Sequence, residues 1–187
     1  MLNLPLLSLV GLSLSLLWLD QPCCRLCQKI TKKAPPWSLK FLRALASLPS
    51  LTLIFFLLPG IWLYMQQDCN SSVIFTLSVL LTLGSALSLK LLFRRPRPQN
   101  PTLKIFSLNA GFPSMHVAGS SAAALALLEF IPNYAQILLA LTGLVSLSRL
   151  LTRAHFLSDL FGGILLASLL QIFFQQTDFW RWLQLLN

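Results

Sequence analysis

The chain has 187 residues, of which 56% are hydrophobic and only 10% are charged, and its formal net charge is +9. A soluble domain carries about 25% charged residues, so this composition excludes an ordinary water-soluble domain and predicts that lipid surrounds much of the chain. The length suits one domain, and we treat residues 1–187 as a single domain. The positive charge is compatible with binding to nucleic acid, anionic lipid or phosphate.

Six apolar segments are long enough, or nearly so, to cross a bilayer, which takes about 20 apolar residues. In chain order they are Leu2–Leu19, Ala44–Met65, Val73–Phe93, Ser114–Ile131, Tyr134–Leu151 and Leu157–Gln175. The first resembles a signal peptide but lacks a basic start and a cleavage motif of small residues, so we expect it to be retained. The sequence therefore predicts an all-α fold, an integral membrane bundle of six transmembrane helices.

Basic residues gather in the three loops that six spans would place on one side of the membrane, residues 20–43, 90–113 and 149–156. All but one of the 14 Lys and Arg residues lie there, and the exception is Arg181. Such a bias is typical of the cytoplasmic side. It also suits a side that binds anions, and the first loop suits contact with anionic lipid. No nucleic-acid reader is recognisable, so we expect no nucleic acid as a partner.

His155 and Asp159 are four residues apart at the start of the last apolar segment, so they share one face of a helix. The carboxylate can accept a hydrogen bond from Nδ1 of the imidazole, which leaves Nε2 neutral and nucleophilic. A buried ion pair is the alternative, but ionisable groups within membrane segments are usually functional. His116, at the start of the fourth segment on the same side, is either a core histidine or a general acid for the leaving oxygen.

Four further residues on this side are candidates to bind phosphate. Lys90, Arg97 and Arg149 supply the positive charge that stabilises a phosphoryl group in transfer. Ser114 can supply its hydroxyl or its backbone N–H at the start of a helix, where anions are favoured.

Carboxylates are scarce on this side of the chain, which holds only Asp20 and Asp159. Phosphatases that use two metal ions bind them with clusters of carboxylates. We therefore expect no metal and no cofactor, and a transfer that passes through a phosphohistidine.

These residues form three motifs that resemble the signature of the type 2 phosphatidic acid phosphatase superfamily. The family pattern is Lys-x6-Arg-Pro, then Pro-Ser-Gly-His, then Ser-Arg-x5-His-x3-Asp, and the matching residues here are Lys90 with Arg97-Pro98, Pro113-Ser114-Met115-His116, and Ser148-Arg149 with His155 and Asp159. Arg95-Pro96 does not fit the first motif, because residue 88 is a serine. Met115 replaces the motif glycine, and we expect it to narrow the pocket or to shield the backbone amide without abolishing function.

The resemblance implies a role for each candidate residue and a class of substrate. His155 would be the nucleophile, Asp159 its orienting partner and His116 the general acid, while Lys90, Arg97, Ser114 and Arg149 would hold the phosphate. The chain resembles small bacterial enzymes that dephosphorylate lipid A at its 1-position, phosphatidylglycerol phosphate or undecaprenyl pyrophosphate. The resemblance thus implies a membrane lipid phosphate as substrate, and an inner-membrane protein whose site faces the periplasm. The charge bias favours the opposite orientation.

Three other functions compete with hydrolysis. The same residues could transfer phosphate to an acceptor lipid instead of water. Cys24 and Cys27, beside Cys23, form a C-x-x-C pair that could serve a membrane thiol oxidoreductase, although this motif alone is a weak signal. The basic face could also belong to a non-catalytic module that binds anionic lipid. No obligate protein partner is inferred.

Overall fold

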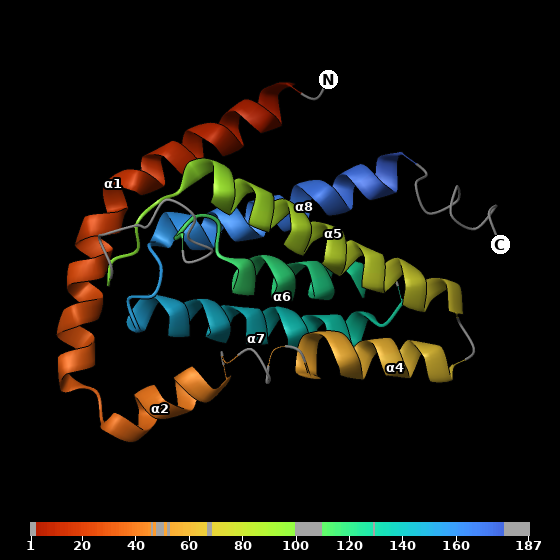
Figure 1. Ribbon diagram of the computed structural model, residues 1–187, viewed down its shortest axis with the longest axis horizontal. Coiled ribbons are helices and arrows are strands. Elements are labelled where there is room, and N and C mark those ends of the chain that lie inside the picture. The colour runs from red at the N-terminus through yellow and green to blue at the C-terminus, as the bar shows by residue number, and fades with distance from the viewer. Residues whose placement is uncertain are drawn as a thin grey trace.

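The computed structural model of the protein describes residues 3–45, 47, 51, 53–66, 69–99, 110–128 and 130–177, and it describes only the backbone of residues 3–15, 45, 53 and 69. The described part contains helices and no strand, which confirms the all-α fold class (Figure 1). The helices are α1 (Asn3–Lys33), α2 (Pro36–Leu45), the π-helix η1 (Leu53–Leu57), α4 (Leu58–Met65), α5 (Cys69–Phe93), α6 (Met115–Ala126), α7 (Pro132–Leu151) and α8 (Leu157–Gln176). Arg181 and the first residue of the expected span Leu2–Leu19 lie outside the described residues.

Three helices within the described ranges are long and apolar enough to cross a membrane, namely α5, α7 and α8. The predicted count of six spans is not confirmed. The segment expected at 114–131 forms the helix α6 of only 12 residues, about 18 Å long against a hydrocarbon core of about 30 Å. In the segment expected at 44–65, residues 44–45 belong to α2 and residues 53–65 are divided between η1 and the eight-residue α4, while residues 46, 48–50 and 52 lie outside the described residues.

The segment expected as the first basic loop, residues 20–43, is helical instead. Helix α1 continues through Pro22 to Lys33, and α2 follows after two residues. Figure 1 shows α1 curving around one end of the bundle, with α2 continuing from it beneath α7. Asp20 and Cys27 on α1 are buried, so tertiary packing supports the helix beyond the apolar run that marks its start.

Helix α6 lies at the centre of the bundle, packed against α5, α7 and α8 (Figure 1). Its small residues are buried except for the half-buried Gly119, and residues of this size let helices pack closely. Two glycines of α8 allow this approach. A Cβ on Gly163 would lie 2.8 Å from the carbonyl oxygen of Ser114, and a Cβ on Gly162 would overlap the ring of Phe112.

One end of the bundle collects the segments that carry the three motifs. The C-terminal ends of α5 and α7 and the N-terminal ends of α6 and α8 meet at the end that α1 crosses (Figure 1). Residues 94–99, which follow α5, and the turn between α7 and α8 lie at the same end. The fold thus brings together motifs that are separated by tens of residues in the sequence.

Candidate active site

A cavity of about 540 Å³ opens among these helix ends. Four of the seven predicted site residues line it: Lys90, Arg97, His116 and His155. The rest of its wall is formed mainly by apolar side chains, namely Leu51, Phe55, Phe56, Val79, Leu80, Leu83 and Met115. One part of the cavity wall therefore carries cations and imidazoles, and the other part is apolar. Met115 contributes to the wall, at the position where the family motif has glycine.

His155 and Asp159 are brought together as their spacing predicts. Their side chains are almost completely buried, and Nδ1 of His155 lies 3.5 Å from Oδ2 of Asp159. This distance is at the outer limit of a hydrogen bond, and the two atoms do not have the geometry of a hydrogen bond. The two side chains are thus neighbours, and the role of Asp159 as the orienting partner of the imidazole stays a prediction.

The position of Asp159 follows from the start of helix α8. Its Oδ2 accepts the backbone N–H of Phe156 at 2.9 Å, which caps the first turn of the helix. A carboxylate at a helix N-terminus is also stabilised by the helix dipole. The same carboxylate thus ends the turn between α7 and α8 and fixes the place of His155 within it.

Burial lowers the pKa of His155 below its ordinary value, although the neighbouring carboxylate of Asp159 opposes this shift. The imidazole is therefore neutral at pH 7, which is the form that the predicted nucleophile requires. Loss of activity by protonation of His155 is expected only below about 6.5, the ordinary pKa of histidine. A profile of kcat/KM against pH tests this, and an acid limb centred above 6.5 would contradict it.

Ser114 is completely buried at the start of α6. Its backbone N–H donates to the carbonyl oxygen of Asp159 at 2.9 Å, so this donor is already used and is not available for phosphate. Its hydroxyl oxygen has no hydrogen-bond partner among the described residues. Of the two groups that the sequence offers for phosphate at Ser114, the hydroxyl is therefore the candidate.

The three predicted cations occupy different surroundings. Lys90 is buried, and its ammonium group donates to the carbonyl oxygen of Ala110, which leaves two of its three donors for a ligand. Nε of Arg97 is buried without a hydrogen-bond partner among the described residues. Arg149 does not line the cavity but lies close enough to Arg97 and His116 for its charge to act on both.

The structure adds Arg95 and Asp20, which sequence reasoning did not assign. The guanidinium of Arg95 contacts Oδ1 of Asp159 at 2.8 Å and Oδ2 of Asp20 at 2.6 Å. Asp20 also accepts the hydroxyl of Ser158 at 2.6 Å and its backbone N–H at 2.9 Å. The guanidinium lies 4.7 Å from the centre of the Phe156 ring. Arg95 therefore links helix α1 to the predicted catalytic carboxylate.

A sequence signal for this link was present. Asp20 and Asp159 are the two acids that the sequence places on the basic side, and a carboxylate in an apolar segment needs a counter-charge. The sequence does not tell which of the many basic residues supplies it.

The cysteines of α1 are free thiols. Cys23, Cys24 and Cys27 form no disulfide, and none of them lines the cavity with the two histidines. The arrangement gives no support to the thiol oxidoreductase hypothesis.

Comparison with known proteins agrees with this geometry. The family model of the PAP2 superfamily matches residues 71–183. The crystal structure described as the first transmembrane PAP2 type phosphatidylglycerolphosphate phosphatase from Bacillus subtilis resembles the chain with a TM-score of 0.66 and 20% identity, and the match covers 92% of this chain and 94% of that one. No curated protein matches the chain. Because the family model matches more than half of the chain and three of its helices can cross a membrane, the chain is an integral membrane protein that belongs to the PAP2 superfamily.

Proposed function

We propose that the protein hydrolyses a phosphate ester of a membrane lipid through a phosphohistidine on His155. The observation that carries this proposal is the composition of the cavity. One part of its wall holds two cations and two imidazoles, and the rest is mainly apolar. A lipid phosphate has the same division, because its headgroup is anionic and its chains are apolar.

The chemistry would proceed in two steps. In the first, Nε2 of His155 attacks phosphorus, the bond to the leaving oxygen breaks, and protonated His116 gives its proton to that oxygen. In the second, water attacks the phosphohistidine and His116 takes a proton from it, which releases inorganic phosphate and restores both histidines. Burial, followed by the charge of Arg149, lowers the pKa of His116 to about 3, so its protonation in the first step requires the negative charge of the bound phosphate, which raises that pKa.

The cations would stabilise the charge that the phosphoryl oxygens carry in both transfers. Lys90 and Arg97 line the cavity. Arg149 does not line it, but its charge acts on Arg97. Fixed charges in a site shielded from water are effective because they need no reorganisation during the reaction. The carboxylates of Asp20 and Asp159 are both paired with Arg95, so neither is a free metal ligand. This pairing supports a mechanism without metal.

The resemblance to bacterial lipid phosphatases suggests the substrate and the location. Phosphatidylglycerol phosphate is the first candidate, because the similar crystal structure is described as a phosphatase of that lipid. Lipid A 1-phosphate is the second. We place the protein in a bacterial inner membrane with its site facing the periplasm, as in the enzymes that the motifs resemble.

Phosphate release by the purified protein in detergent with EDTA tests the proposal. The panel comprises phosphatidylglycerol phosphate, lipid A, phosphatidic acid and undecaprenyl pyrophosphate. We expect release from at least one of them, undiminished by EDTA. Activity that disappears with EDTA would overturn the mechanism. Transfer to an added acceptor lipid without free phosphate would overturn hydrolysis in favour of phosphotransfer.

His116→Asn should separate the general acid from the nucleophile. We expect kcat to fall by about 10²–10⁴-fold on a lipid phosphate, whose alkoxide leaving group needs a proton. On p-nitrophenyl phosphate, whose leaving group is stable without one, the loss should be much smaller. An equal loss on both substrates would show that His116 acts in another way, such as holding the phosphate.

A further inference from the structure

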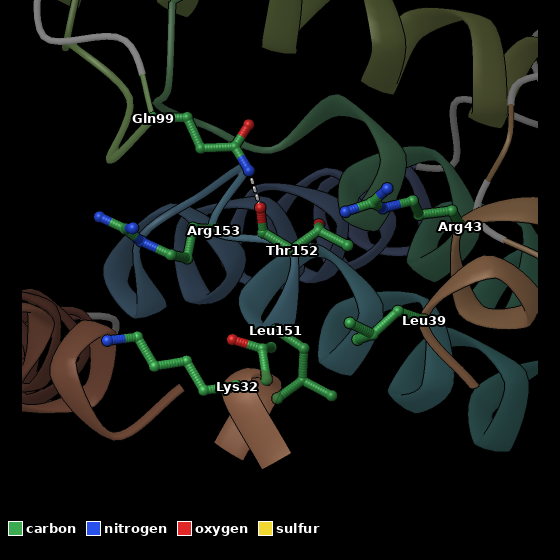
Figure 2. A pocket seen from close by; sticks show the side chains of 8 residues that line it. Lys32, Leu39, Arg43, Gln99, Leu151, Thr152 and Arg153 are labelled. Carbon is green, nitrogen blue, oxygen red and sulfur yellow. Dashed lines mark hydrogen bonds between the residues drawn. The ribbon is translucent and has the colours of Figure 1, made fainter. Parts of the chain in front are cut away.

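A second cavity, of about 290 Å³, lies between α1, α2 and the segment that joins α7 to α8. It is lined by Thr31, Lys32, Leu39, Arg43, Gln99, Leu151, Thr152 and Arg153, none of which lines the cavity with the two histidines. Three of these residues are basic and none is acidic. Figure 2 shows Lys32 and Arg153 on one side and Arg43 on the other, with the hydrogen bond from Gln99 to the Thr152 carbonyl between them in this view.

The wall that α2 contributes is tied to the bundle by a hydrogen bond. The hydroxyl of Ser148 donates to the carbonyl oxygen of Leu42 at 2.8 Å, which ties α2 to α7. Ser148 belongs to the third family motif but is buried in this contact. The contact between α2 and α7 therefore fixes the position of this wall.

The opposite wall is formed by the turn after α7. Arg153 has φ of 56°, a left-handed conformation that is uncommon for residues other than glycine. The backbone N–H groups of Ala154 and Thr152 hold this turn by donating to carbonyl oxygens of α7. Nε of Arg153 is buried and has no hydrogen-bond partner among the described residues. A buried donor without a partner is costly, and an anion in the cavity would satisfy it.

Helix α2 carries a different chemistry on its other face. Trp37 and Phe41 are four residues apart, share one face and are 71% and 62% exposed. Leu39 and Arg43 lie on the opposite face and line the cavity. Tryptophan and other amphipathic anchors gather where hydrocarbon meets headgroups, so this face suits a helix that lies in the membrane interface.

We propose that this cavity binds the phosphate group of an anionic phospholipid, separate from the lipid that is hydrolysed. With the aromatic face of α2 in the interface, Lys32, Arg43 and Arg153 lie at the depth of headgroup phosphates. Two exposed positive side chains on neighbouring helices and the half-buried Arg153, whose Nε is buried, match a phosphate that carries net negative charge. The phosphate of a zwitterionic lipid carries an ammonium group that this basic lining would repel.

The test compares two variants of the full chain that lose the same charge. Lys32→Gln with Arg43→Gln removes two exposed cations of the cavity. Lys29→Gln with Lys40→Gln removes two exposed cations from the same helices that do not line it. All four side chains are exposed, so both variants should fold. Native mass spectrometry of the delipidated protein in neutral detergent measures the binding of short-chain phosphatidylglycerol, phosphatidylcholine and inorganic phosphate.

We expect the protein to bind phosphatidylglycerol more tightly than phosphatidylcholine, and the cavity variant to bind it at least tenfold more weakly, while the matched variant binds as the original does. Equal losses in the two variants would overturn the site in favour of a general charge effect. Equal binding of the two lipids would overturn the preference for an anionic headgroup. Inorganic phosphate that binds as tightly as phosphatidylglycerol would overturn the lipid as the source of the phosphate.

Discussion

Replacing His155 with asparagine is expected to abolish phosphate release, with a loss in kcat on the order of 10⁴-fold or more. The asparagine amide is smaller than the imidazole and keeps an N–H donor for Asp159, but it has no nucleophilic nitrogen, so the phosphohistidine cannot form. The measurement is phosphate release with EDTA present on the best lipid of the panel. Labelling with radioactive substrate should trap phosphate on the original protein and not on the variant.

The control for this variant addresses the thiols of α1. Cys24→Ser with Cys27→Ser should leave phosphate release unchanged, because these free thiols do not line the cavity. Retention of activity by His155→Asn in a protein with an unchanged thermal midpoint would contradict the assigned nucleophile and the phosphohistidine.

Replacing Arg95 with methionine is expected to destabilise the protein by about 3–5 kcal/mol. The change leaves two carboxylates, Asp20 and Asp159, buried without the cation that contacts both. Methionine has a similar length, so the main loss is the charge and its hydrogen bonds. Thermal unfolding in detergent measures the effect. Asp20→Asn should destabilise the protein less, because it leaves Arg95 one buried carboxylate and keeps a side chain that Ser158 can contact.

The neighbouring Arg94 provides a matched control. It is exposed and follows α5 directly, and its Nε donates to the carbonyl oxygen of Leu91 at the end of that helix. Arg94→Met should therefore change the free energy of unfolding by about 0.5 kcal/mol or less. Equal effects at the two positions would show that the Arg95 contacts contribute little to stability. Arg95→Lys should recover only part of the loss, since an ammonium group cannot contact two carboxylates with a planar fork.

Hydropathy predicts the helices of this fold unevenly. Three uninterrupted apolar segments correspond to α5, α7 and α8, because lipid requires a continuous apolar run there. Hydropathy does not predict the helices within residues 20–43, because these residues are largely polar and basic and tertiary contacts stabilise the helices. The short α6 was overestimated, because its small buried residues read as apolar whether or not they cross a bilayer.

Motif spacing located much of the site but not its supports. The three motifs indicated Lys90, Arg97, His116 and His155, and the fold brings these four to one cavity. The link from Asp20 through Arg95 to Asp159 joins residues from three elements, and no local pattern encodes such a pairing. The use of the Ser114 N–H by the backbone of α8 was equally invisible, because it depends on how closely α6 and α8 approach.

The position of Asp20 on α1 bears on what constitutes an autonomous unit in this chain. The matched family region, residues 71–183, contains the three motifs but neither Asp20 nor the wall residues Leu51 and Phe55. A fragment limited to that region would expose the guanidinium of Arg95 to solvent and remove part of the apolar wall of the cavity. It would contain every motif residue, but it would lack the contact of Asp20 with Arg95 and the wall residues that hold the motif residues in place. The smallest active form of the protein is thus expected to begin before Asp20, outside the region that the family model matches.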